Sequence, residues 1–394
     1  MTIVIVNPMN DAHCRHMTNR LQELGIDYVE LESPLTNDYA LLDGVLYYNG
    51  KAIRKASSVF YRGVMTHNPE YFLLEDPERY NVQVQFGGRA EAVREWLRIM
   101  HLEGAFVINP PSYNSKYHQL YKLRRAGVAV PDTCITASVE LAREFARRAD
   151  GQAVCKPLPG GSFCRRIDES FWASLGDADT FGEPVIFQEE IKGRDVRVNM
   201  LEGQVLSAHM IVTSHDDIVD YRTDPNYSDG AITYKQVSLP DEVAEMCDRA
   251  MKALGLRFSG IDLRLTPDGR FVLIECNSMP AYLDIERKTS ASITDGLIEA
   301  LRKHSTDAPP EYRAELYELD GGNGTGMSKP VATSLFPYYD VMKKWSEQML
   351  TEQPRIVMPM NEEQQEQFWQ ETGKRVKMME VERHGREVRI SRVW

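Results

Sequence analysis

Phe258-Ser259-Gly260-Ile261-Asp262-Leu263-Arg264 and Phe271-Val272-Leu273-Ile274-Glu275-Cys276-Asn277 are the two segments that decide the fold of this 394-residue chain. Both are mainly apolar and rich in strand-forming residues. Between them, Thr266-Pro267-Asp268-Gly269 is typical of a tight turn. Together the segments predict an antiparallel β-hairpin.

The charged residues of this predicted hairpin fall on one face. Residues two apart on a strand share a face, so Glu275 and Asn277 project together, and Asp262 and Arg264 can project to the same side from the partner strand. Two carboxylates and an amide oxygen from adjacent strands suit a hard cation such as Mg²⁺ held beside phosphates. The alternative is a hairpin whose acids face water. Cys276 is expected on the opposite face.

Composition describes an ordinary globular protein of two or three compact units, with 42% hydrophobic and 26% charged residues. The formal net charge of −12 argues against a general nucleic-acid or anionic-membrane binder. No apolar run approaches the roughly 18–20 residues that span a bilayer. The six cysteines include no C-x-x-C pair, which favours reduced thiols in a cytoplasmic protein. We therefore expect a cytoplasmic location, with no nucleic-acid and no membrane partner.

The order of predicted elements divides the chain into several regions. Strands and helices alternate over the first 110 residues, as in an open α/β sheet, and Asn109-Pro110-Pro111 breaks that pattern. Residues from 188 onward are rich in predicted strands and end in a helix near 290–303. We expect an N-terminal domain at 1–110, two further subdomains at 111–187 and 188–305, a linker at 306–330, and a small α+β C-terminal extension at 331–394, with helices near 338–350 and 361–371 and a hairpin turning at His384-Gly385.

Two lysines are placed where they could neutralise phosphates. Lys156 ends a predicted strand and precedes Pro157-Leu158-Pro159-Gly160-Gly161-Ser162, a loop whose backbone N–H groups could fold over a polyphosphate. Lys116 opens a predicted helix soon after the proline pair. Each lysine, taken alone, also fits an ordinary surface position.

Residues 188–197, Gln-Glu-Glu-Ile-Lys-Gly-Arg-Asp-Val-Arg, form a predicted hinge between two strands. An apolar strand enters this polar segment, turns at Lys192-Gly193, and leaves with Asp195 and Arg197 on one face. Such a hinge can hydrogen-bond an adenine edge through its backbone, while an acid binds the ribose hydroxyls. A solvated connection between strands is the alternative.

Taken in order, these motifs resemble the ATP-grasp superfamily, particularly its RimK-like branch. The resemblance covers roughly residues 105–303, with K-P-L-x-G-G from Lys156, Q-E-E-I-x-G-x-D-x-R from Gln188, D-x-R from Asp262 and E-C-N from Glu275. It implies an α/β protein that is α+β within its ATP-grasp part. A pre-ATP-grasp α/β domain would precede two subdomains that hold the nucleotide between them.

The resemblance also implies a role for each motif residue. Asp262, Glu275 and Asn277 would hold one or two Mg²⁺, with Mn²⁺ able to substitute. Arg197 and Arg264 would stabilise the transferred phosphoryl group. ATP would be bound by the lysines, the glycine loop and the hinge, namely Lys116, Lys156, Gly160, Gly161, Ser162, Gln188, Glu189, Glu190, Ile191 and, for the ribose, Asp195.

The glycine loop departs from the family pattern. The segment from Gly160 to Arg165 contains fewer glycines than many loops of the family. We therefore expect Arg165 or Arg166 to compensate by contacting phosphate.

The polar segment 216–226 is expected to overhang the cleft, and it carries Arg222. Its D-x-R element, Asp220-Tyr221-Arg222, is similar to one in graspetide or microviridin-type peptide ligases. Arg222 would there grip an acyl phosphate or a substrate carboxylate; a plain surface loop is the alternative. His209 lies nearby in the sequence, but a lone histidine in a strand is more typical of packing than of catalysis.

The implied activity is that of a ligase. ATP would activate a carboxylate as an acyl phosphate, and an amine or a hydroxyl would attack it, releasing ADP and phosphate. The alternatives are a kinase on the same fold, a graspetide-type macrocyclase, and, disfavoured by the intact lysine and acid set, a non-catalytic nucleotide-binding regulator. We expect a small-molecule or peptide substrate with a carboxylate, and a separate nucleophile, and we also consider a homodimer. Nothing in the residues distinguishes a free amino acid from a peptide.

Overall fold

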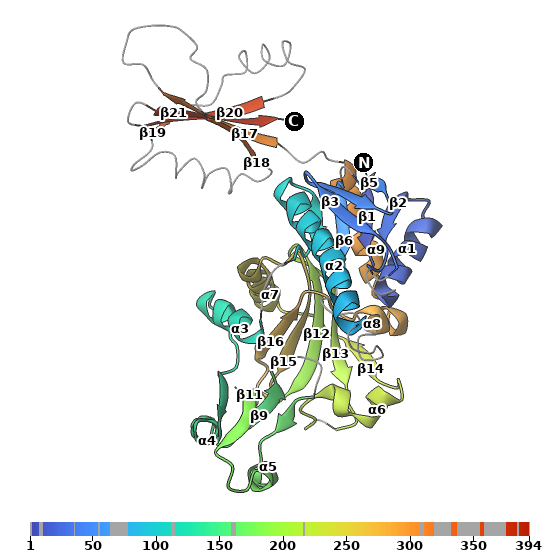
Figure 1. The fold of residues 1–394 in the computed structure, drawn as a ribbon. Coiled ribbons are helices and arrows are strands. Elements are labelled where there is room, and N and C mark those ends of the chain that lie inside the picture. Colours follow the sequence, from blue (N-terminus) through green and yellow to red (C-terminus); the bar gives the residue numbers. More distant parts are fainter. Residues whose placement is uncertain are drawn as a thin grey trace. The chain divides into compact units, whose positions relative to one another are not determined.

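The computed structural model describes residues 2–7, 11–34, 36–53, 56–63, 78–111, 115–158, 163–215 and 217–306, and five strands between 311 and 393 (Figure 1). The chain divides into two compact units, Met1–Pro111 with Ile298–Trp394, and Ser112–Leu297. The mixed architecture of helices and several sheets agrees with the predicted α/β class. The expected glycine loop at 159–162, the turn at 384–385, and the helices near 338–350 and 361–371 lie outside the described residues.

The first unit begins with a parallel sheet of strand order β2-β1-β6-β7. All four residues of its central strand β1 are buried and apolar, as expected of a strand covered on both faces. Helix α1 follows because the Asp11 carboxylate caps the N–H groups of His13 and Cys14, and it ends before Gly25, which adopts φ +64°. The bounds are β1 Ile3–Val6, α1 Ala12–Glu23, β2 Tyr28–Leu31, β6 Ser58–Tyr61, α2 Glu78–Leu102 and β7 Phe106–Ile108.

A small antiparallel sheet of β3, β4 and β5 joins this unit. Asn49 and Gly50 both have positive φ, which is the conformation that a two-residue type I′ hairpin requires. The strands pack against α2, whose Trp96 is fully buried in the unit's core. The bounds are β3 Tyr39–Leu42, β4 Val45–Tyr48 and β5 Lys51–Ile53.

The second unit contains two sheets, of which the first has the order β10-β9-β11-β8. Strand β11 runs from Thr180 through Glu189, so the first two hinge residues continue the strand. Their backbone positions are therefore set by antiparallel pairing with β8 and β9. The bounds are α3 Lys116–Arg125, β8 Thr133–Ser138, α4 Val139–Arg148, β9 Ala153–Pro157, β10 Arg165–Arg166, α5 Glu169–Ser174 and β11 Thr180–Glu189.

The second sheet of this unit is antiparallel and has the order β14-β13-β12-β15-β16. The predicted hairpin is confirmed as β15 and β16, with Asp262 paired to Glu275 across the ladder. The next strand, β12, pairs Arg197 with Asp262 and Asp195 with Arg264. The bounds are β12 Arg194–Leu201, β13 Gln204–Val212, η2 Tyr221–Thr223, α6 Pro225–Ser228, β14 Thr233–Gln236, α7 Asp241–Leu254, β15 Phe258–Leu265, β16 Phe271–Asn277, α8 Leu283–Lys288 and α9 Ile293–Thr306.

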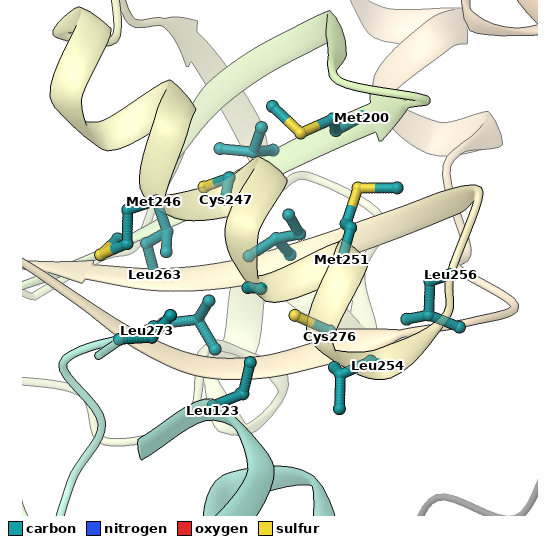
Figure 2. Close-up of a cluster of buried hydrophobic side chains, with 14 of the residues drawn as sticks. Leu123, Met200, Met246, Cys247, Met251, Leu254, Leu256, Leu263, Leu273 and Cys276 are labelled. Atoms are coloured by element: carbon teal, nitrogen blue, oxygen red, sulfur yellow. The ribbon is translucent and has the colours of Figure 1, made fainter. Parts of the chain in front are cut away.

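One face of this sheet is covered by a hydrophobic core (Figure 2). Figure 2 shows Cys247 and Met251 of α7 in one cluster with Leu263 and Cys276 of the strands, and Leu123 of α3 at the margin of that cluster. Cys276 is 3% exposed and lies on this apolar face, which confirms its predicted orientation. The alternating residues Glu275 and Asn277 are consequently turned to the other face.

The last strands form an antiparallel sheet of order β18-β17-β21-β20-β19. The predicted final hairpin is present as β20 and β21, paired from Val376–Val393 to Arg383–Arg386. The bounds are β17 Glu311–Glu318, β18 Ala332–Phe336, β19 Arg355–Val357, β20 Val376–Arg383 and β21 Arg386–Val393. Within the described part of the chain, no helix is both long enough and apolar enough to cross a membrane.

Candidate active site

The centre of the candidate site is a row of charged side chains across three neighbouring strands. Arg197 on β12, Asp262 on β15 and Glu275 on β16 occupy paired register positions on the face opposite the core. The Nε of Arg197 donates to Oδ1 of Asp262 at 2.6 Å. Burial by itself would lower the pKa of Arg197, but the Asp262 carboxylate raises it above its usual range, so the guanidinium is a fixed cation.

Asp262 has the surroundings of a metal ligand. Its second oxygen, Oδ2, accepts a hydrogen bond of 2.9 Å from Nδ2 of Asn277, which leaves the amide oxygen of Asn277 available to a cation. Burial raises the pKa of Asp262, although the Arg197 charge lowers it, and the nearby Glu275 adds to the rise. A further cation would stabilise these two carboxylates in their charged form. Two carboxylates and an amide oxygen are donors that fit Mg²⁺ or Mn²⁺.

No cluster of three or more His, Cys, Asp or Glu side chains occurs at metal-binding spacing among the described residues. The candidate metal site therefore has two acids and one amide, and it needs oxygen ligands from a substrate or from water. This composition is normal for Mg²⁺, which usually keeps waters and binds phosphates together with one or two carboxylates.

The two predicted phosphate lysines come together beside this row. Lys116 Nζ lies 3.4 Å from Oε2 of Glu275, and Lys156 Nζ lies 3.3 Å from Oε1 of Gln188. Burial lowers the pKa of Lys156, while the Glu275 charge raises it and the Lys116 charge lowers it. Two cations held this close, one of them poorly solvated, would be stabilised by an anion such as a polyphosphate.

Lys116 depends on a residue that the sequence reasoning missed. One turn further along α3, Gln119 is buried and bonds the backbone of the edge strand β16 twice. Its Nε2 donates to the carbonyl of Cys276, and its Oε1 accepts from the Cys276 N–H, both at 2.8 Å. Gln119 thus holds α3 against the strand that carries Glu275. Its spacing of three from Lys116, on one face of a helix, was the signal available in the sequence.

The hinge residues are engaged by the protein itself. Gln188 is buried and, besides accepting from Lys156, donates from Nε2 to Oγ1 of Thr133 at 3.0 Å. The Glu189 carboxylate accepts from the N–H of Asp132 at 3.3 Å. Glu190 forms a two-pronged ion pair with Arg166, at 2.8 and 2.6 Å. These side chains set the shape of the hinge and leave its backbone to contact a base.

Two cavities of about 880 and 820 Å³ adjoin the hinge. Glu190 and Gln152 line both of them. The larger is otherwise lined mainly by α3, β8 and α4, and the smaller by Ile191, Arg264 and the turn after β15. Both volumes lie within the range of small-molecule sites. Neither cavity is lined by the two lysines, Lys116 and Lys156, or by the charged row of Arg197, Asp262 and Glu275.

Asp195 and Arg264 form a second charged pair, two residues along β12 and β15 from the Arg197–Asp262 pair. Nε of Arg264 lies 3.2 Å from Oδ1 of Asp195. Arg264 also donates to the carbonyls of Gly193 at 2.7 Å, Ile218 at 3.4 Å and Val219. Burial raises the pKa of Asp195 to about 7, although the Arg264 charge lowers it. In this arrangement Arg264 connects the hinge to the segment beginning at Asp217.

That segment, residues 217–222, is held over the sheet from several sides. The Asp220 carboxylate accepts from the N–H of Cys164 at 2.9 Å and from the guanidinium of Arg222 at 2.6 and 2.9 Å. Arg166 donates to the carbonyl of Asp217 at 3.0 Å. The Arg222 guanidinium also lies 5.5 Å from the ring centre of Phe163. Asp220 therefore orients Arg222 and joins this segment to the residues that follow the glycine loop.

Arg165 or Arg166 was expected to contact phosphate in place of the missing glycines. The guanidinium of Arg166 forms an ion pair with the Glu190 carboxylate. Arg165 places its guanidinium 4.6 Å from the ring centre of Phe171. Gly160, Gly161 and Ser162 themselves lie outside the described residues.

Comparison with known proteins finds ligases. Residues 166–298 match the family model described as D-ala D-ala ligase C-terminus. The chain is 26% identical, over 231 residues, to a probable alpha-L-glutamate ligase of Trichodesmium erythraeum (strain IMS101), covering 54% of this chain and 73% of that protein.

Among solved structures, the chain resembles the ATP-grasp ligase PsnB complexed with a phosphomimetic variant of a minimal precursor, Mg and ADP. The TM-score is 0.66 with 26% identity, covering 77% of this chain and 98% of that one. The macrocyclase MdnC of Microcystis aeruginosa MRC, bound with precursor peptide MdnA, has the same fold, with a TM-score of 0.62, 19% identity, and coverage of 76% and 99%.

The fold, the site and these likenesses define the class: the chain resembles the ATP-grasp ligases. It is a ligase that joins a carboxylate to an amine at the expense of ATP and uses Mg²⁺, and in sequence it is similar to glutamate ligases.

Proposed function

We propose that the carboxylate substrate of this ligase is a side chain or terminus of a peptide. The observation that supports this is the likeness to PsnB in complex with a precursor, which extends over nearly the whole of that ligase and over about three quarters of this chain. The curated glutamate ligase matches a smaller share of this chain. A peptide that carries both the acid and the nucleophile would make the product a macrocycle.

The nucleotide is proposed to lie between the hinge and the charged row. Its base would occupy the 820 Å³ cavity beside Ile191, and its ribose would meet Asp195. Lys116 and Lys156 would neutralise the phosphates, assisted by Gly160, Gly161 and Ser162. Gln188 would position Lys156, and Glu189 and Glu190 would hold the hinge through Asp132 and Arg166.

Asp262, Glu275 and Asn277 are proposed to hold the metal. Bound Mg²⁺ would supply a Lewis acid for the phosphate oxygens. Arg197, fixed by Asp262, lies next in the row and would stabilise the negative charge that develops on the transferred phosphoryl group. Arg222, oriented by Asp220, would bind the substrate carboxylate.

The chemistry then needs no covalent nucleophile on the protein. A carboxylate oxygen attacks the γ-phosphorus and ADP leaves, which produces an acyl phosphate. The nucleophile attacks the acyl carbon, phosphate leaves, and one proton is lost. The contribution of the protein is to align the reactants, neutralise charge and exclude water from the acyl phosphate.

The test measures ADP release with ATP and Mg²⁺ over separate pools of free amino acids and of acidic peptides, with mass spectrometry of the products. Release that requires a peptide, with loss of one water from the peptide or a peptide pair, supports the proposal. Release with free glutamate alone would instead support the amino-acid alternative. A phosphorylated product that does not react further would identify a kinase.

The predicted homodimer is tested by sedimentation of the purified chain with and without ADP and Mg²⁺.

A further inference from the structure

Two deeply buried polar side chains lie beside the charged row, each with one atom that has no hydrogen-bond partner. Asn199 on β12 is 0% exposed and His209 on β13 is 5% exposed. Among the described residues, the Oδ1 of Asn199 and the Nδ1 of His209 are buried and unsatisfied. The Nδ2 of Asn199 is satisfied, since it donates to Oγ of Ser207 at 3.0 Å.

The strand register places both side chains on the same face as the charged row. Arg197 pairs with His209, and Asn199 pairs with Ser207, across the β12–β13 ladder. Asn199 and His209 are therefore diagonal neighbours, and such positions are about 7–8 Å apart between their Cα atoms and closer between side chains. The two unsatisfied atoms therefore belong to neighbouring side chains on one face of the sheet.

Across the sheet, the residues follow a consistent order. Glu275 lies on β16, Asp262 on β15, Arg197 on β12 and His209 on β13, each on the strand next to the previous one. The ligase reaction needs a metal, a cation for the phosphoryl group and a place for the nucleophile. His209 is the next residue after Arg197 in this order, and its own register partner on the edge strand β14 is Gln236.

The unsatisfied atoms indicate what kind of group would bind there. A buried polar atom without a partner costs about 1–3 kcal/mol, and native structures contain few of them. Because Nδ2 of Asn199 already donates to Ser207, the unsatisfied atom of Asn199 is its oxygen Oδ1, which is an acceptor. Desolvation by burial lowers the pKa of His209, so its ring is neutral and one ring nitrogen carries a lone pair. An orphaned acceptor is tolerated more readily than an orphaned donor, which favours the lone pair on Nδ1.

We propose that Asn199 and His209 form the binding site for the attacking nucleophile, a primary amine, and that His209 accepts its proton. This inference rests on the proposed function, because it concerns the second half of the ligase reaction. The amine nitrogen forms its bond to the acyl carbon, the bond from that carbon to the phosphate oxygen breaks, and the proton moves from nitrogen to Nδ1 of His209. Asn199 acts as a positioning residue that orients the amine.

A binding experiment tests the site without any turnover. The whole chain, labelled with ¹⁵N-histidine, is studied by long-range ¹H–¹⁵N NMR, with His209→Gln to assign the signal. The expected result is an unprotonated Nδ1 whose resonance moves on addition of n-butylamine and stays in place with n-butyrate. A protonated Nδ1, or a resonance that moves only with butyrate or with neither probe, overturns the proposal. The amine titration uses the wild-type chain, and the variant serves only to assign the His209 signal.

A kinetic experiment separates the two half-reactions. Hydroxylamine captures acyl phosphates directly, so it reports carboxylate activation with little need for a base. His209→Gln is expected to keep forming hydroxamate from the carboxylate found in the pooled assay, while losing about 10²–10⁴-fold in amide formation with the amine. Asn199→Ala is expected to raise the KM for the amine more than it lowers kcat.

The matched control is His215→Gln, which changes an exposed histidine just beyond β13 and is expected to react like wild type. Equal loss of hydroxamate and amide in His209→Gln would show a structural role and overturn the proposal. Full retention of amide formation would overturn it as well. A wild-type chain that forms no hydroxamate with any pooled carboxylate contradicts the proposed function, and the NMR result then still decides whether the amine site exists.

Discussion

Arg197 and Asp262 are joined by a 2.6 Å hydrogen bond between side chains that lie 65 residues apart in the chain and face each other on neighbouring strands. Both are held on the polar face of a sheet whose other face is a hydrophobic core. This pair fixes the geometry of the whole row, because Asn277 bonds the second oxygen of the same carboxylate and Glu275 lies opposite it.

The metal assignment predicts that Asp262→Asn and Glu275→Gln weaken Mn²⁺ binding in the presence of ADP. Replacing a metal ligand is expected to cost at least the roughly 10–100-fold typical of outer-sphere partners. Electron paramagnetic resonance of free Mn²⁺ measures the affinity. Glu245→Gln on the exposed side of α7 is the matched control and should bind like wild type. Unchanged binding in both site variants would contradict the assignment.

Gly260 is predicted to be irreplaceable for a steric reason. A Cβ at this position would lie 2.4 Å from Cβ of Pro280 and 3.2 Å from Nη1 of Arg197. Gly260→Ala should therefore push Arg197 away from Asp262, lower activity, and destabilise the fold by about 1–3 kcal/mol, as overpacking does. Urea denaturation and ADP release check this.

The comparison for that variant is Gly88→Ala in α2, where an added Cβ meets nothing within 4 Å. It should stabilise the chain by about 0.5–1 kcal/mol, because glycine is unfavourable inside a helix. A Gly260→Ala variant that behaves like Gly88→Ala would show that Arg197 has room to move.

Asp195 predicts a specific dependence of stability on pH. Its pKa in the folded chain is about 7, above the ordinary aspartate value near 3.8, and the main cause is burial. Between about pH 4 and pH 7 the folded state therefore binds more protons than the unfolded state, so this group makes the free energy of unfolding fall as pH rises. One pKa unit corresponds to about 1.4 kcal/mol, so the effect is a few kcal/mol at most.

Urea denaturation of wild type and Asp195→Asn across this pH range measures the difference. The variant should lose the downward slope that Asp195 contributes. Asp268→Asn serves as the opposite case, since hydrogen bonds from Thr266 and Arg270 lower the pKa of that exposed acid. The stability that ionised Asp268 contributes to the folded state is present above the pKa of the unfolded state, and it is lost as the pH falls through the pKa of the folded state. Identical slopes in wild type and Asp195→Asn would refute the prediction.

Arg166 is predicted to control the order of the segment 217–222. It bonds Glu190 of the hinge and the carbonyl of Asp217 together. Arg166→Ala should increase hydrogen exchange in this segment and raise the KM for ATP, while global stability changes by less than about 1 kcal/mol because the pair is partly exposed. Hydrogen-exchange mass spectrometry provides the readout.

For that experiment, Arg270→Ala removes a more exposed arginine that pairs with Asp268 in a surface turn. It should leave exchange in 217–222 as it is. If Arg166→Ala also leaves hydrogen exchange in this segment unchanged, Arg166 does not order the segment, and the contacts of Arg264 and Asp220 are sufficient to hold it.

Gln119 is predicted to position Lys116. Gln119→Leu removes both hydrogen bonds to the backbone of Cys276 and leaves that edge strand unpaired there. The expected cost is about 1–3 kcal/mol, with weaker ATP binding as α3 moves relative to Glu275. His118→Leu, on the exposed side of the same helix, should leave nucleotide affinity unchanged when both are measured by calorimetry.

Much of the site could be predicted from the chain itself. The β15–β16 hairpin, the turn at Gly269 and the sharing of one face by Asp262, Glu275 and Asn277 follow from alternation along strands and from turn chemistry, which are local. The orientation of Cys276 toward the core followed from the same alternation.

Residue partners were harder to predict. That Gln188 borders the adenine stays a prediction, whereas the bonds of its side chain to Lys156 and Thr133 were not predicted. That Arg264 stabilises the transferred phosphoryl group also stays a prediction, and the contacts of its guanidinium with Asp195 and three backbone carbonyls were not predicted. These contacts join segments 32 to 71 residues apart, and no local pattern encodes which one forms.

The sequence by itself determined which residues are candidates for the chemistry and which face of each strand they occupy, because side-chain alternation is a property of a single strand. Only the tertiary structure decided that Arg197 meets Asp262, that Gln119 holds Lys116 in place, and that Asn199 and His209 are buried together. The reason is that register between strands is set by the packing of distant segments, through core contacts and hydrogen bonds that exist only once the sheet has assembled.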